Sequence, residues 1–146
     1  MNIIEATREL IAKFPRISEI GTVHLEFADL APDSYSLSSA GDELLREDIC
    51  GNQVRRHTFY FYSVWQSLND FDRLNNSGAL LDLAQYLEKH GRRTEITAEI
   101  DGKEYPGEIT KITTANGMLY EIPAGLNGGV RYQLQLIVEY KIYTEE

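Results

Sequence analysis

The stretch Arg55–Gly91, RRHTFYFYSVWQSLNDFDRLNNSGALLDLAQYLEKHG, joins an aromatic segment to an amphipathic one, and it holds seven of the chain's fifteen aromatic side chains. Phe59 and Phe61 alternate with tyrosines, which predicts a strand whose phenylalanine face points into a core. Tyr60 and Tyr62 lie on the opposite face, which is too apolar for ordinary solvent-exposed surface. We therefore expect a covering helix or a partner chain on the tyrosine face.

An amphipathic helix is predicted directly after the aromatic strand. Its apolar residues recur at i, i+3, i+4 and i+7 and form one buried stripe: Leu80, Leu83, Ala84 and Leu87. Asn76 or Ser77 is expected to cap its start, because a short side-chain oxygen accepts a free backbone N–H. Lys89 and His90 lie in the last turn, where positive charge favours the helix dipole. Gly91 is expected to end the helix in a left-handed conformation.

The N-terminal part of the sequence predicts one further helix and two strands. Apolar residues from Ile3 to Phe14 have helical spacing, and Pro15 is expected to stop that helix. Residues 22–30 alternate as a strand does, and residues 35–39 predict a short second strand.

Three turn signals predict hairpins. They lie at Cys50-Gly51-Asn52, at Asp101-Gly102 and at Asn116-Gly117, and the third is stronger than the second because both of its flanks look extended. The hairpin around Asp101 occupies about residues 94–106. Pro106 is expected at a sheet edge or a bend, because proline cannot donate to a strand ladder.

The segment VRYQLQLIVEYKIY, residues 130–143, alternates almost perfectly and predicts a long final strand. Together these elements predict one α+β domain over residues 1–146, with a mainly antiparallel sheet and two helices packed on one side. The strand order does not follow from the sequence.

Composition narrows the classes of function. Fourteen Lys and Arg against 23 Asp and Glu give a net charge of −9, which argues against free-standing nucleic-acid binding. The N-terminus lacks the pattern of a signal peptide, and no apolar run is long enough to cross a bilayer. Cys50 is the only cysteine. We expect a protein of the reducing cytoplasm, with no disulfide and no cysteine-based metal site.

The sequence predicts no catalytic residue, no metal and no cofactor. There is no glycine-rich phosphate loop, no histidine pair at zinc-binding spacing and no serine in a glycine-flanked elbow. His57 is interpreted as a structural or rim histidine. The carboxylates of residues 42–48 and of Asp70 and Asp72 are interpreted as exposed charges, and Cys50 as a small edge residue.

Three stretches in this order resemble a family of small prophage proteins from Gram-positive bacteria. The first two are YSLSSAGDELLREDICGNQVRRHTFYFYSVW, residues 35–65, and RLNNSGALLDLAQYLEKHG, residues 73–91. The third is ITTANGMLYEIPAGLNGGVRYQLQLIVEYKIY, residues 112–143. Members are described as minor capsid, tail terminator or head–tail joining proteins. The chain departs from the family pattern at residues 92–108, where it inserts a hairpin.

The resemblance implies a structural virion protein rather than an enzyme. A tail terminator is expected to form a homo-oligomeric ring, usually a hexamer, that ends growth of the tail tube and joins the tail to the head. Its partners would be copies of itself, the tail tube protein and the head connector protein. DNA would pass through without being bound specifically, and no membrane is involved. The protein would occur in the bacterial host cytoplasm and then in the virion.

Under this interpretation, the ring interface uses the tyrosine face and the outer residues of the final strand: Tyr60, Tyr62, Arg131, Gln133, Gln135 and Tyr143. Tyrosine suits such an interface because it offers a large contact area at low entropic cost. Two other interpretations remain open. One is a monomeric adaptor that binds another protein. The other is a small enzyme, which would need a deep pocket holding His57 or the Asp70 and Asp72 pair.

Overall fold

The computed structural model describes residues 1–14, 23–25, 34–66, 70–121 and 129–144. Over these ranges the chain is α+β, with a six-stranded sheet and two helices. The helices are α1 (Ile3–Ala12) and α3 (Asp70–His90). The strands are β1 (Val23–Leu25), β2 (Ser34–Glu47), β3 (Gln53–Gln66), β4 (Glu95–Ile100), β5 (Lys103–Glu121) and β6 (Gly129–Ile142).

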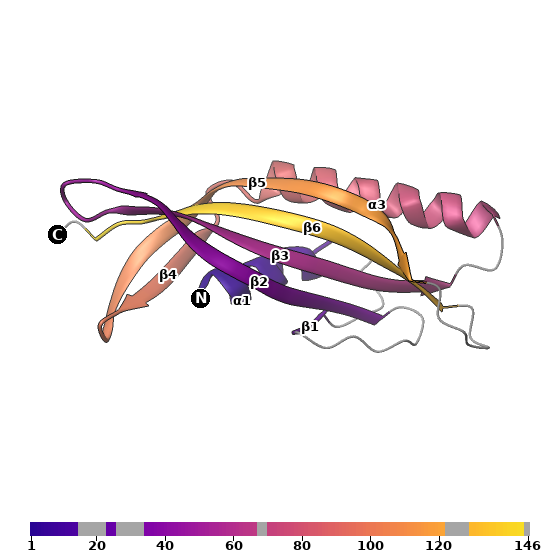
Figure 1. The fold of residues 1–146 in the computed structure, drawn as a ribbon, viewed down its shortest axis with the longest axis horizontal. Helices are drawn as coiled ribbons and strands as arrows, with labels where there is room; N and C mark the ends of the chain where they lie inside the picture. The colour runs from indigo at the N-terminus through magenta and orange to yellow at the C-terminus, as the bar shows by residue number, and fades with distance from the viewer. Residues whose placement is uncertain (15–22, 26–33, 67–69, 122–128, 145–146) are drawn as a thin grey trace.

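The strand order is β1-β2-β3-β6-β5-β4. Among the described strands, only β1 and β2 run parallel, and the other four pairings are antiparallel, so the prediction of a mainly antiparallel sheet is confirmed. Figure 1 shows long, curved strands, with α3 running along the sheet beside β5. The β2–β3 hairpin reaches past both helices.

The phenylalanine face of β3 lies in the core, as its alternation predicts. Phe59 and Phe61 are fully buried, and they lie opposite Leu136 and Leu134 of β6. Alternate residues of β6 from Tyr132 to Ile142 are also buried. We call this the inner face of the sheet and the opposite one, which carries Tyr60, the outer face.

Both helices pack on the inner face. Helix α1 starts with a capping box between Asn2 and Glu5 and buries a face that includes Ile11. The predicted stripe of α3 is buried as well: Leu80, Leu83, Ala84 and Leu87. These residues join the buried sheet residues in one core cluster, so the prediction of two helices on one side is confirmed.

The predicted start of α3 is wrong. The helix begins at Asp70, and Asn76 and Ser77 lie within it, although their side chains are outside the described residues. One glycine inside a helix, here Gly78, costs only about 1 kcal/mol relative to alanine. A continuous backbone ladder therefore outweighs the local capping signal of Asn76 and Ser77.

The predicted conformation of Gly91 is also wrong. Its φ is not in the left-handed region, and Arg93 takes that conformation instead, with φ 66°. A Cβ on Gly91 would lie 2.2 Å from Ile112 Cδ1 and 2.7 Å from the carbonyl oxygen of Leu87. Glycine is needed here because the end of α3 closely approaches β5.

Two of the three predicted hairpins form. Residues 48–52 connect β2 to β3, and the Asp48 carboxylate accepts hydrogen bonds from the backbone and side chain of Asn52. Asp101 and Gly102, with φ of 52° and 76°, form the two-residue turn between β4 and β5. Pro106 lies in the part of β5 that pairs with β4. The pairing of β5 with β6 begins at the next residue, Gly107.

The predicted turn at Asn116-Gly117 does not form. Strand β5 runs through this dipeptide to Glu121, with a register shift against β6 between Ala115 and Met118. A bulge accommodates the dipeptide because the long β6 supplies a continuous partner on this side. The predicted short strand at residues 35–39 is likewise part of the fourteen-residue β2.

Candidate functional site

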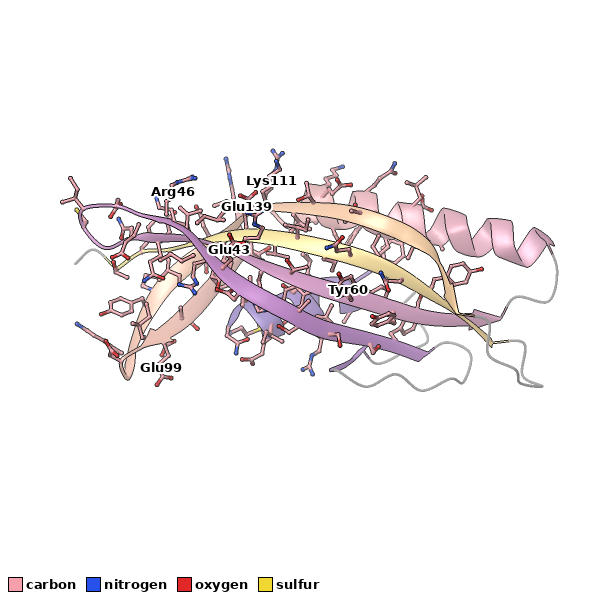
Figure 2. The ribbon with its side chains drawn as sticks, viewed as in Figure 1. Glu43, Arg46, Tyr60, Glu99, Lys111 and Glu139 are labelled. Carbon is pink, nitrogen blue, oxygen red and sulfur yellow. The ribbon has the colours of Figure 1, made fainter. Side chains whose placement is uncertain are left out.

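Four of the six predicted interface residues form one patch on the outer face. Tyr60 lies opposite Gln135, and Tyr62 lies opposite Gln133, on the adjacent strands β3 and β6. All four side chains are half-buried. We call this set the tyrosine–glutamine patch. Figure 2 shows Tyr60 near the middle of the sheet.

Tyr143, a fifth predicted interface residue, lies apart from this patch. Tyr143 lies eight residues beyond Gln135, which is roughly 26 Å of extended strand. Its hydroxyl donates a 2.8 Å hydrogen bond to Glu108 Oε1. Arg131 lies within β6, but its side chain is outside the described residues.

A row of charges with alternating sign crosses the outer face beside the patch. Glu43, Arg56, Glu139 and Lys111 are successive neighbours on β2, β3, β6 and β5. Figure 2 labels three of them, together with Arg46, near the base of the β2–β3 hairpin. Arg56 Nη2 lies 3.8 Å from Glu43 Oε2. Such exposed pairs contribute little stability singly, but their alternation favours this strand register.

A second polar cluster lies on the inner face, at the end of the apolar core. We call it the Asp42 network: Ser39, Asp42, Arg55, His57 and Tyr140. Asp42 Oδ2 accepts a hydrogen bond from the Tyr140 hydroxyl and lies 2.9 Å from His57 Nδ1. Arg55 Nε lies 2.6 Å from Asp42 Oδ1. Ser39 Oγ lies 2.5 Å from His57 Nε2.

The network depends on local features of three strands. A register shift in β2 between Ser39 and Gly41 lets both Ser39 and Asp42 reach His57 on β3. The His57 side chain is only 7% exposed, and its imidazole stacks on Phe59 with ring centroids 4.3 Å apart. Packing therefore fixes the imidazole ring between the carboxylate and the hydroxyl.

The charges of the network shift the pKa values of its members. Burial raises the pKa of Asp42, but hydrogen bonds from Tyr140, Arg55 and His57 outweigh burial and hold that pKa below its ordinary value of 3.8. Burial, and then the hydrogen bond to Asp42, raise the pKa of the Tyr140 phenol. Asp42 is thus a carboxylate and Tyr140 a neutral donor near pH 7.

The atom order in the network is that of a nucleophile, a base and an orienting acid. An ionised carboxylate only accepts, so His57 Nδ1 carries the proton that faces Asp42. In neutral His57, Nε2 is then an acceptor for the Ser39 hydroxyl. Sequence analysis missed this set because no motif marks it. The available signal was the predicted turn at residues 50–52, which brings Asp42 and His57 to nearby positions on paired strands.

Two clefts lie where β4 meets the start of α1. One has a volume of about 570 Å³, and residues such as Ile3, Glu104 and Tyr140 line it. The other has a volume of about 600 Å³, and Glu95 and Tyr143 are among its lining residues. Neither is lined by His57. The side chains of Asp70 and Asp72 lie outside the described residues.

Among the described residues there is no group of three or more His, Cys, Asp or Glu side chains that could hold a metal ion. Cys50 is exposed in the β2–β3 connection. In the described part of the chain, no helix is both long and apolar enough to cross a membrane.

No family model matches the chain, and no curated protein matches it either.

Proposed function

We propose that this chain is a structural virion protein of a phage or prophage, a tail terminator that assembles into a ring. The ring ends growth of the tail tube and joins the tail to the head. The observation that carries the proposal is the tyrosine–glutamine patch, which lies on the sheet face opposite both helices. The resemblance of the sequence to the tail terminator family is the second support.

The patch has the chemistry of a self-association surface. Tyrosine side chains bury a large area with few rotatable bonds, and glutamine amides both donate and accept hydrogen bonds. A stable interface buries about 800 Å² on each partner, which requires more than four residues. The neighbouring charge row of Glu43, Arg56, Glu139 and Lys111 can extend the contact and set its orientation.

A head-to-tail contact between copies closes into a ring when the rotation at each interface adds up to a full turn. The net charge of −9 fits a ring through which DNA passes, because a surface without a basic footprint does not hold phosphates. The tail tube protein and the head connector protein would bind the two ends of that ring.

The test is a charge substitution in the patch. Tyr60→Glu with Tyr62→Glu should abolish ring assembly and leave a folded monomer, because carboxylates without partners would be buried at the interface. Rings are scored by light scattering after size-exclusion chromatography and by electron microscopy of isolated tails. Leu81→Glu is the matched control, since Leu81 is an apolar residue that is 58% exposed on α3.

An intact ring in the double variant would refute the placement of the interface. A wild-type chain that stays monomeric even with tail tubes present would refute the terminator function and favour an adaptor. The genes beside the source gene provide an independent check. A portal or capsid gene on one side and a tube protein gene on the other are expected.

A further inference from the structure

We propose that Ser39 is an activated nucleophile, with His57 as its general base, and that it accepts acyl groups from small carboxylic esters. This proposal is independent of ring assembly. It rests on the Asp42 network, which no part of the terminator function uses. A nucleophile within hydrogen-bond reach of a base, with the base held by a third group, is the arrangement that activates serine for attack.

The distances between Ser39, His57 and Asp42 fit that arrangement. Ser39 Oγ and Asp42 Oδ2 lie on opposite ring nitrogens of His57, at 2.5 Å from Nε2 and 2.9 Å from Nδ1. Asp42 is itself fixed by Arg55 Nε at 2.6 Å and by the Tyr140 hydroxyl. The imidazole therefore has one orientation, and its free lone pair faces the serine hydroxyl.

A purely structural role does not account for the position of His57 as well as a role as a base does. Asp42 already has two donors in Arg55 and Tyr140, so it does not need His57 to be satisfied. His57 keeps both hydrogen bonds when it is neutral and when it is protonated, because Nε2 accepts from Ser39 in one state and donates to it in the other. A general base must keep its position when it gains and loses a proton, and these hydrogen bonds allow His57 to do so.

The Asp42 network borders solvent. Ser39 is half-buried, and the side chains of Asp42 and Arg55 are 25% and 28% exposed. In the described ranges, β1 pairs with β2 only at Tyr35–Leu37, and β3 is the one described neighbour of β2 from Ser38 onward. Backbone N–H groups on a strand edge can donate to the oxyanion that forms during acyl transfer.

The reaction balances without a metal or a redox partner. Ser39 Oγ forms a bond to the carbonyl carbon of the ester while its proton moves to His57 Nε2. The carbon–oxygen bond to the alcohol then breaks, and that proton leaves with the alcohol. Water attacks the acyl group next and gives a proton to His57. The Ser39–acyl bond breaks, the acid departs, and the proton returns to Ser39 Oγ.

The test uses the full chain and a fluorophosphonate probe, which forms an Oγ–phosphorus bond as fluoride leaves. Intact mass and peptide mapping should show one adduct per chain, on Ser39. Ser39→Ala should remove the adduct. His57→Gln should slow its formation by about 100-fold or more, the usual contribution of a general base. Ser38→Ala is the matched control, because Ser38 is the neighbouring half-buried serine, and it should label as the wild type does.

A second measurement follows hydrolysis of p-nitrophenyl acetate, for which a burst equal to the protein concentration is expected. Thermal unfolding shows whether each variant is folded. If His57→Gln is not folded, the comparison of Ser39→Ala with Ser38→Ala is sufficient to test whether the adduct forms on Ser39. Absence of an adduct on folded wild-type protein would overturn the proposal. So would an adduct that persists in Ser39→Ala. Ring assembly in Ser39→Ala should be unchanged, so the two proposals fail separately.

Discussion

Asp42 is the residue on which the polar contacts of the inner face converge. It lies on β2, His57 and Arg55 lie on β3, and Tyr140 lies on β6. Its carboxylate therefore ties three adjacent strands together through side chains, in addition to their backbone ladder. The contact lies at the base of the β2–β3 hairpin, where the apolar core ends. We expect its removal to loosen that hairpin first.

Tyr140→Phe tests this role at the residue scale. The variant keeps the ring, which is 5% exposed, and removes only the donor to Asp42. Because the acceptor is charged but partly exposed, we expect the free energy of unfolding to fall by about 1–2 kcal/mol at pH 7. Urea denaturation measures this. Tyr143→Phe is the control, since it removes a donor to Glu108 near the surface, and it should change stability by less than about 0.5 kcal/mol.

The same variant has an expected pH dependence. Because the pKa of Asp42 is lowered in the folded protein, its contribution to stability is present above its ordinary pKa of 3.8 and is lost as the pH falls through the folded value. The difference between wild type and Tyr140→Phe should therefore shrink on acidification below about pH 4. A difference that stays constant to pH 2 would show that the lost donor does not act through the Asp42 carboxylate.

At the scale of elements, the end of α3 is fixed by its contact with β5. The Gly91 N–H continues the helix by donating to the carbonyl oxygen of Leu87 at 2.9 Å, and Arg93 N–H then donates to the carbonyl oxygen of Ile109 at 2.7 Å. The chain thus passes directly from helix to sheet. At Gly91 an added side chain would meet Ile112 of β5.

Gly91→Ala should destabilise the protein by about 1–3 kcal/mol, because its Cβ would overlap Ile112 and the Leu87 carbonyl oxygen. Gly78→Ala is the matched change, within α3. Nothing lies within 4 Å of its Cβ position, so it should stabilise by about 0.5–1 kcal/mol. Thermal unfolding of both variants gives the comparison. A stabilising Gly91→Ala would contradict the close approach of α3 to β5.

Local sequence patterns were sufficient to predict the elements whose structure does not depend on distant parts of the chain. The alternation of β3 and β6, the α3 stripe and the Asp101-Gly102 turn are all correct because burial and turn geometry follow from a few adjacent residues. Asn116-Gly117 shows the limit, since a turn and a bulge accept similar residues and the long partner strand decides between them. The Asp42 network needs the register of β2 on β3, including a bulge, so residue types alone could not reveal it.

At the scale of the whole molecule, one core holds the sheet and both helices together. Residues of α1 and α3 belong to the same buried cluster as those of β2, β3, β5 and β6. No described element has a core of its own. The parts of the protein should therefore unfold together.

Equilibrium unfolding in urea should accordingly show a single transition. Far-UV circular dichroism reports both helices and strands, and fluorescence reports the only tryptophan, Trp65 of β3. The two curves should have the same midpoint and slope within error. A helical signal that is lost at lower urea than the fluorescence signal would show that the helices are not part of the common core.

The position of β6 has a consequence for synthesis. β6 comes last of the described strands along the chain, yet it lies between β3 and β5 and pairs with both. While the ribosome makes the chain, β3 and the distal part of β5 emerge first, each with an unpaired edge that can associate with other nascent chains. The sheet can form only after residues 129–142 have left the ribosome, so β3 and β5 remain without their shared partner until β6 has emerged.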